Sequence, residues 1–523
     1  MLFFKRNLIP FYLLSLIFFV FAFYQSYKWR WICDDAYISF VYARNLYEGS
    51  GFVFNVGERV EGYTNFLWTL LLSLGYYLKL EPQFLSLFLG IIFYLMTLFI
   101  FFYEENKKSI GKIYPLLLVH LSLFFHLHIF ATSGLETSLF TFLVCFGLLL
   151  WEKEKVLLFV VFLFSALVRP EGALFLFIAS LDWIIRKRSW TPVLFGVLFL
   201  GFLSFRYFYY GDLLPNTFYA KGNKGAYFSQ GFYYLLYFLK SYPLYLFVLV
   251  LFGLQTYKRL KSQKENRFLL SSILLYIFYV LYVGGDFMGI RFWIPILPYI
   301  SYLAFQQIHD WDLDSQIESN KKSYLLYLYS KNQILVAFLF ILSAAVYADP
   351  LKIKGTRIPD WFGIVEERMF YEDHLINTSG YDTDALSEFR VAFFGAQAHF
   401  IYFLRPSFAF EAESGLTDRE FAKKKVSVRG RIGHESELEL KDLLDRKIEI
   451  LLDNRLHGTN LPHIQYTWRS IPITFYLLSY EPAKMNSLCI RSDWNCSDLY
   501  QLMFENHWDK TQRKMFVETN GIR

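Results

Sequence analysis

Charged residues are scarce in this chain. They make up 19% of its 523 residues, whereas hydrophobic residues make up 55% and aromatic residues 21%. Ordinary soluble domains carry roughly 25% charged residues. The mean hydropathy is correspondingly high, at +0.30. These values exclude an ordinary soluble enzyme and predict a polytopic α-helical membrane protein.

Cysteines are few, and nucleotide-binding motifs are missing. The four cysteines cannot form a disulfide-rich scaffold, and only Cys489 and Cys496, in CIRSDWNC, are spaced for a local bridge, which requires an oxidising compartment. The sequence has no Walker loop, no GxGxxG after a predicted strand and no Cys–His cluster, so nucleotide-driven transport has no support. The formal net charge is +6, but the basic residues lie mostly in short turns between apolar runs. That pattern sets membrane topology and gives no indication of nucleic-acid binding.

Apolar runs typical of membrane helices recur through the first two thirds of the chain. The first follows Lys5 and Arg6, and no small-x-small cleavage pattern comes after it, so we interpret it as a retained helix with a cytoplasmic start. The run Phe66–Leu78 is too short to cross, and counting it would place Lys107 outside, against the positive-inside rule. We therefore expect an interfacial or re-entrant helix there. The remaining runs predict about eleven crossings, at about 8–24, 84–103, 113–130, 135–151, 156–168, 172–185, 190–207, 232–256, 268–283, 292–306 and 333–347.

The character of the sequence changes after Ala348. Charge density rises, and the apolar runs shorten to strand length. Val391–Phe394 and Ile448–Leu452 are typical of buried strands and Leu438–Leu444 of a helix, which favours an α/β layer structure. We therefore expect two domains, a membrane domain over 1–348, with an acidic first outer loop at 25–82, and a soluble domain over 349–523. The odd number of crossings places the soluble domain outside the cell.

The acidic first outer loop contains the most distinctive sequence motifs in the chain. It reads CDDAYIS from Cys33, then YARNL, then GERVEGYTNFLWT. Two adjacent acids, Asp34 and Asp35, lie directly after the first apolar run, and acids beside a membrane usually bind a substrate, an ion or a proton. Asp before Ala-Tyr-Ile-Ser is also a natural helix N-cap, and both roles can hold at once.

These stretches resemble the mycobacterial terminal β-(1→2) arabinofuranosyltransferases, which are GT-C type membrane glycosyltransferases. VRPEG around Arg169, LPNTFYAKG around Lys221 and GGDFMGIRF around Arg291 are similar to motifs of the same family. So are GLTD at Gly415–Asp418 and GRIGHE at Gly430–Glu435 in the distal domain.

The resemblance implies a GT-C fold and an inverting transferase of the bacterial cytoplasmic (inner) membrane. Such an enzyme moves a sugar, here arabinofuranose, from a polyprenyl-phosphate donor to an extracytoplasmic glycan acceptor. Donors carrying mannose, glucose or aminoarabinose, with lipopolysaccharide or protein as acceptor, remain alternatives. A lipid-linked sugar transporter would need polar residues near the bilayer midplane and repeated halves, and the sequence shows neither.

Catalytic roles follow from that chemistry. Removal of the acceptor proton needs a base, which a carboxylate supplies. Asp34 is favoured because the first acid of this loop plays that role in related GT-C enzymes, and Asp35 then serves substrate or metal binding. Cations must hold the donor phosphate, and Arg169, Lys221 and Arg291 are the candidates. The alternatives are an ion pair between Arg169 and its neighbour Glu171, and snorkelling of lone cations at the interface.

Polar and aromatic side chains of the outer loops are the candidates for sugar binding. An interfacial aromatic belt and helix capping are the competing explanations for some of them. Asp34, Asp35 and Glu61 are also hard oxygen ligands, suited to Mg²⁺, Mn²⁺ or Ca²⁺. The distal domain is expected to bind the glycan acceptor or to serve as a stabilising lid. The substrate-binding candidates are Glu61, Tyr63, Asn65, Glu136, Glu171, Asn216 and Asp286.

Overall fold

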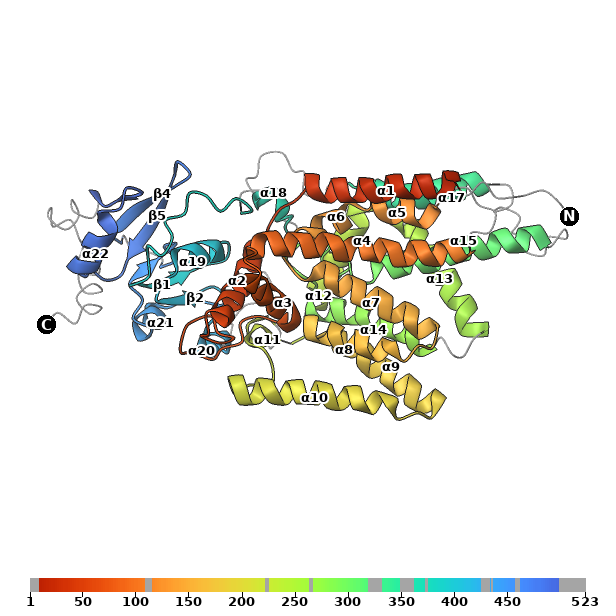
Figure 1. The fold of residues 1–523 in the computed structure, drawn as a ribbon, viewed down its shortest axis with the longest axis horizontal. Coiled ribbons are helices and arrows are strands. Elements are labelled where there is room, and N and C mark those ends of the chain that lie inside the picture. Colours follow the sequence, from red (N-terminus) through yellow and green to blue (C-terminus); the bar gives the residue numbers. More distant parts are fainter. Residues whose placement is uncertain are drawn as a thin grey trace.

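A helical bundle and a sheet-containing C-terminal domain lie end to end in the computed structural model (Figure 1). Helices α2 (Asp34–Tyr47), α3 (Phe66–Tyr77) and α11 (Asn216–Lys221) lie where the two parts meet. The structure describes residues 9–108, 115–221, 225–262, 267–317, 332–348, 362–371, 375–424, 433, 436–456 and 461–497.

Helices occupy most of each apolar run that was expected to cross the membrane. Two of these runs are not continuous helices, because residues 292–296 form turns and the run at 113–130 is broken at Phe124. The bundle consists of α1 (Ile9–Lys28), α4 (Pro82–Lys108), α5 (Leu116–Leu123), α6 (Phe125–Ala131), α7 (Thr137–Glu152), α8 (Leu157–Val168), α9 (Gly172–Lys187), α10 (Thr191–Tyr210), α12 (Phe228–Ser241), α13 (Tyr245–Ser262), α14 (Arg267–Val283), α15 (Leu297–Ile317) and α17 (Gln333–Ala345).

Candidate membrane spans are fewer than expected. Three helices of the described chain are long and apolar enough to cross, namely Pro10–Lys28, Pro82–Lys107 and Thr191–Tyr210. They indicate a membrane protein, but they do not support the about eleven crossings that the sequence predicted. For five apolar helices of 10–17 residues the reason is length. A helix such as α8, with 12 residues, rises only about 18 Å, whereas the hydrocarbon core is about 30 Å thick.

The expected span at 232–256 is two helices and not one. Helices α12 and α13 meet at an angle of 111°, and together they would count as a fourth candidate span. The break falls at Pro243, whose ring cannot continue a helix and which disfavours helical geometry at Tyr242 before it. Helix α3, by contrast, is as short as the sequence indicated, and its interfacial position remains a prediction.

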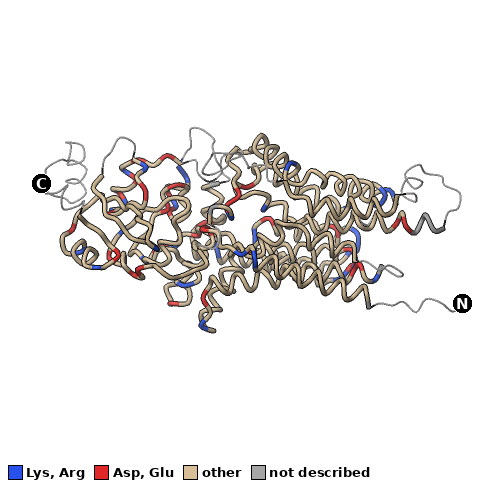
Figure 2. The backbone as a smooth tube through the Cα atoms, turned by 90° about the horizontal axis from the view of Figure 1, so that it is seen from above, with Lys and Arg blue, Asp and Glu red and all other residues tan. Residues whose placement is uncertain are grey.

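Basic turns gather at the end of the bundle that is far from the C-terminal domain. Figure 2 shows charged positions there and at the junction of the two parts, with largely uncharged helix between them. Lys153 pairs with Glu104, and Arg259 lies 2.5 Å from Glu152. These ion pairs tie together the ends of α4, α7 and α13, where the sequence placed its cytoplasmic turns.

The C-terminal domain contains a mixed six-stranded sheet in the order β2-β1-β3-β5-β4-β6. The first three strands in that order are parallel and the others antiparallel. The strands are β1 (Arg390–Phe393), β2 (Phe408–Glu411), β3 (Ile450–Leu451), β4 (His463–Trp468), β5 (Ile471–Leu477) and β6 (Trp494–Asn495), and the helices are α18 (Arg368–Tyr371), α19 (Ala398–Leu404), α20 (Arg419–Ala422), α21 (Leu440–Asp445) and α22 (Pro482–Cys489).

Several sequence predictions for this domain are confirmed. Strands β1 and β3 and helix α21 fall on the segments expected to adopt those structures. Cys489 and Cys496 form a disulfide, which links the end of α22 to the residue after β6. Of the expected motif at Gly430–Glu435, all but Gly433 lies outside the described residues.

Candidate active site

A cavity of about 380 Å³ lies at the end of the bundle that faces the C-terminal domain. Its wall comes from segments far apart in the sequence, namely α2, the 62–65 segment before α3, the turn before α7 and the turn between α8 and α9, together with the segments after α10 and α14. The C-terminal domain contributes Leu416. The polar residues of the wall are Asp35, Ser39, Tyr63, Thr64, Asn65, Glu136, Arg169, Glu171, Arg206, Thr217, Tyr279, Tyr282, Asp286 and Arg291.

Arg169 joins two acids of the wall. Its Nη1 lies 2.5 Å from Glu136 Oε1, and its Nε lies 2.5 Å from Glu171 Oε1. All three side chains are buried. The sequence offered a pair with Glu171 as the alternative to phosphate binding, and the structure forms that pair and adds Glu136. Because a guanidinium has five N–H donors, Arg169 keeps donors beyond these two bonds.

Two further arginines line the cavity, each beside an acid. Arg291 Nε lies 2.5 Å from Asp286 Oδ2, and Arg206 Nε lies 2.9 Å from Glu61 Oε2. Arg206 was not among the sequence candidates. It lies within the aromatic helix α10, four residues before its end. Its partner is 145 residues away in the chain, so no local signal marked it as a site residue.

Glycines bring Asp286 to the cavity. Gly284 and Gly285 both have positive φ, of 89° and 77°, a region that side-chain-bearing residues rarely adopt. A Cβ at Gly285 would lie 2.3 Å from Tyr234 Cγ, so close packing adds a second reason for glycine. The GGDFMGIRF motif thus turns sharply after α14.

The adjacent acids Asp34 and Asp35 point to different places. Asp35 is in the cavity wall and Asp34 is not. The Asp34 carboxylate instead accepts hydrogen bonds from Ala398 N at 2.8 Å and His399 N at 3.0 Å, and His399 Nδ1 lies 2.6 Å from Oδ1. Neither acid caps its own helix, because the N-cap of α2 is Cys33. Asp34 holds the start of α19 in the other domain.

The candidates for sugar binding divide into two groups. Tyr63 and Asn65 are in the wall, and Asn65 Nδ2 donates to Glu136 Oε2 at 2.9 Å. Glu61 lies behind the wall and reaches it through Arg206. Asn216 also lies behind it, where its amide donates to the main-chain oxygens of Gly415, Leu416 and Asp418 at 2.7 to 3.1 Å. Lys221 ends α11, and its side chain lies outside the described residues.

Burial raises the pKa of the Glu61 carboxyl from about 4.5 to about 7, although the Arg206 guanidinium acts in the opposite direction. The group lies in the loop between α2 and α3, outside the candidate spans. The ion pair at this edge of the cavity is therefore sensitive to pH near neutrality.

The expected metal ligands do not assemble. Asp34 binds α19 and Glu61 binds Arg206, which leaves Asp35 as the one member of the trio in the wall. Within the described ranges, no group of three or more His, Cys, Asp or Glu side chains is arranged to hold a metal ion.

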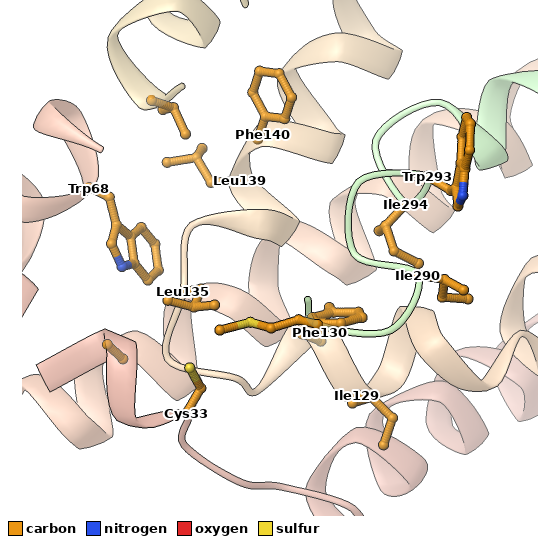
Figure 3. Close-up of a cluster of buried hydrophobic side chains, with 14 of the residues drawn as sticks. Cys33, Trp68, Ile129, Phe130, Leu135, Leu139, Phe140, Ile290, Trp293 and Ile294 are labelled. Carbon is orange, nitrogen blue, oxygen red and sulfur yellow. The ribbon is translucent and has the colours of Figure 1, made fainter. Parts of the chain in front are cut away.

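Buried apolar side chains pack around the segment before α7, where Leu135 also lines the cavity. Figure 3 shows Trp68, Leu135, Leu139 and Phe130 among these buried side chains. Trp68 Nε1 donates to Gly134 O at 3.1 Å, which fixes α3 against the turn that precedes Glu136. The acids of the wall are thus held on closely packed segments.

Comparison with known proteins finds two distant homologues, both named terminal β-(1→2)-arabinofuranosyltransferase. The chain is 32% identical to the protein of Mycobacterium tuberculosis strain H37Rv over 249 residues, which cover 42% of this chain and 39% of the relative. It is 28% identical to the protein of Corynebacterium glutamicum over 359 residues, which cover 57% of this chain and 50% of the relative. The matches thus span half or less of these curated relatives. No family model matches the chain, and no solved structure matches it.

Proposed function

We propose that the protein is an inverting glycosyltransferase of the GT-C type. It moves a sugar, with arabinofuranose as the first candidate, from a polyprenyl-phosphate donor to a glycan acceptor on the extracytoplasmic face of the bacterial cytoplasmic membrane. The distant homology to named arabinofuranosyltransferases suggests lipid-linked sugar transfer. The observation that carries the proposal is a cavity in which the carboxylate of Asp35 and three arginines share one wall at the end of an apolar bundle.

The arginines suit a phosphate leaving group. Arg169, Arg206 and Arg291 are all buried and all line the cavity. A donor phosphate placed among them would receive charge-assisted hydrogen bonds from guanidinium N–H groups that the wall acids do not use. The wall acids hold the arginines in place before the donor arrives, so little reorganisation accompanies binding.

Asp35 is the proposed base. The sequence favoured Asp34, but both of its oxygens accept hydrogen bonds from α19, outside the cavity. Asp35 lies in the wall and removes the proton of the acceptor hydroxyl as that oxygen attacks the anomeric carbon. The bond from this carbon to the phosphate oxygen breaks as the new bond forms, and a single in-line displacement of this kind inverts the anomeric configuration.

The wall also suits a sugar. Asn65 and Ser39 provide amide and hydroxyl groups, and Tyr63, Tyr279 and Tyr282 provide aromatic rings. Sugar hydroxyls need fixed donors and acceptors, whereas the ring faces need flat apolar surface. The C-terminal domain, which contributes Leu416, is proposed to position the glycan acceptor over the cavity.

The experiment is a transfer assay with the purified protein in lipid. Polyprenyl-phosphate donors carrying arabinofuranose, mannose, glucose or aminoarabinose are supplied in separate reactions with cell-envelope glycan, and the products are analysed by mass spectrometry. Transfer from the arabinofuranose donor, with inverted configuration, is expected. Transfer from only one of the other donors would replace arabinofuranose by that sugar in the proposed function. Absence of transfer from all four, by a protein that binds none of them, would reject the function. Glycans from cells with and without the protein identify the missing residue independently.

A further inference from the structure

Helix α2 has two faces with different partners. Asp35, Ile38 and Ser39 line the cavity, and their spacing of three and four residues places them on one side of the helix. Asp34 and Tyr37 belong to the other side. Tyr37 OH donates to Leu375 O at 2.5 Å, and its ring lies 5.4 Å from the ring of Tyr402 in α19. The helix thus lies between the cavity and the C-terminal domain.

Asp34 makes three polar contacts between α2 and the C-terminal domain. The Asp34 side chain is 3% exposed and the His399 side chain 6%. The carboxylate accepts from two main-chain N–H groups of α19, and it lies 2.6 Å from His399 Nδ1. A buried carboxylate needs such partners, since an unpaired buried charge is costly. Asp34 is therefore held in one position, and Asp35 follows it directly in the same helical turn.

The His399 ring is itself fixed by its neighbours. Its centroid lies 4.1 Å from that of Phe400, 5.6 Å from that of Trp468 and 6.0 Å from that of Tyr381. All three rings belong to the C-terminal domain. The ring of Tyr37 in α2 lies further away, at 6.2 Å. The position of Nδ1, and with it that of Asp34, is consequently set mainly by packing within the C-terminal domain.

We infer that His399 is a positioning residue, through which the C-terminal domain holds Asp35 at the cavity by way of Asp34. The inference rests on the proposed role of Asp35 as the base. It gives the C-terminal domain a role in the turnover step itself, separate from any binding of the acceptor. His399 is not among the residues that line the cavity, so its proposed action on the reaction is indirect.

Three variants of the full chain test the inference. His399→Phe keeps an aromatic ring for packing and removes the Nδ1 contact with Asp34. His399→Asn places an amide N–H close to the position of Nδ1, so it keeps a donor for Asp34. Arg405→Gln is the matched control, because it breaks another contact between the same elements, a half-exposed pair between Arg405 Nη2 and Glu48 Oε1 at 3.0 Å. Glu48 follows the last turn of α2, about 20 Å from Asp34 along the helix.

The measurements are steady-state transfer and hydrogen exchange of α2 and α19. A base displaced by about 1 Å loses up to about 100-fold in rate, so His399→Phe should lower kcat by about 10-fold to 100-fold. KM for the donor should stay within about twofold, since the arginines are untouched. Exchange at the start of α2 and α19 should rise. His399→Asn should restore most of the turnover, and Arg405→Gln should behave like the natural chain.

Three outcomes would overturn the inference. They are a His399→Phe variant with natural kcat, a His399→Asn variant as impaired as His399→Phe, and equal impairment by Arg405→Gln. Failure of the proposed function is distinguishable, because the natural chain would then transfer no sugar. In that case the exchange measurement still decides whether His399 holds α2, and unchanged exchange in His399→Phe would contradict it.

Discussion

Arg169 Nη1 lies 2.5 Å from Glu136 Oε1, and this ion pair joins the turn between α8 and α9 to the segment before α7. The same guanidinium reaches Glu171 through Nε. Removing one partner of a buried ion pair leaves the other uncompensated, which is more costly than the pair is favourable. Arg169 thus bridges the two wall acids, and in the proposed function its remaining N–H donors bind the donor phosphate.

The arginines of the cavity should carry donor binding. Arg291→Ala and Arg206→Ala are each expected to lower the affinity for the donor by about 10-fold to 150-fold, since a charge-assisted hydrogen bond contributes about 1.5 to 3 kcal/mol. Arg169→Ala and Lys221→Ala should act in the same direction. Donor dissociation constants of the purified variants measure this. Lys423→Ala, which removes a surface pair with Asp212, is the control, and natural affinity in all of the cavity variants would exclude the phosphate site.

The ionisation of Glu61 should make stability depend on pH. Its pKa is about 7 in the folded chain and about 4.5 when unfolded. Between these values the folded chain binds more protons, so the free energy of unfolding falls as pH rises, by up to about 3 kcal/mol. Below pH 4.5 and above pH 7 the contribution is constant.

Thermal unfolding in detergent from pH 4 to 8 measures this effect. Glu61→Gln should remove the decline, whereas Glu48→Gln, at an exposed carboxylate next to the same loop, should keep it. Identical pH profiles for the Glu61 variant and the natural chain would show that the Glu61 carboxyl does not titrate in this range.

The sequence predicted the helical segments well, because the length and composition of an apolar run are local properties that can be read without knowing the fold. It overestimated the number of candidate spans, because the run at 232–256 was read through Pro243 as one helix although α12 and α13 meet there at 111°, and because short helices such as α8 were counted as crossings. The different environments of two adjacent acids also could not be predicted. Asp34 and Asp35 are equivalent in the sequence, and only the position of α19, more than 360 residues away, separates their environments.

The site residues show the same limit. Sequence motifs indicated Asn65, Glu136, Arg169 and Asp286 as site residues, and all four line the cavity. Arg206 gave no signal, because its significance comes from a partner on a distant loop. Asn216 had a distinctive motif, but its amide is engaged with main-chain oxygens of the C-terminal domain.

Asn216 should matter for the contact between the two domains. Its amide donates to three carbonyl oxygens, and Asn216→Asp would set a carboxylate against them, with the loss of three hydrogen bonds. A fall in the free energy of unfolding of about 1 to 3 kcal/mol or more is expected. Asn377→Asp is the control, because the Asn377 side chain accepts from Ser379 N through Oδ1, and an aspartate keeps that acceptor. Equal stability of the two variants would contradict the role of Asn216.

The topology can be tested with two tags. One is placed at Lys107, in a basic turn, and the other in the C-terminal domain. Because α3 is expected not to cross, the tags should report opposite sides of the membrane, with the C-terminal domain outside. Labelling of intact cells with an impermeant reagent reads this directly. Tags on the same side would contradict the placement of the acidic loop and the cavity on the outer face of the membrane.

The role of Asp35 is the central claim. Asp35→Asn keeps the shape of the side chain and removes the proton acceptor, so turnover should fall by about 100-fold to 10,000-fold, while the donor dissociation constant changes little. The decisive measurement is single-turnover sugar transfer by Asp35→Asn at saturating donor, beside donor binding by the same preparation. The account predicts intact binding with nearly abolished transfer. Transfer within a few-fold of the natural rate would contradict it and assign the base to Asp34, outside the wall, or to a different acid within the wall.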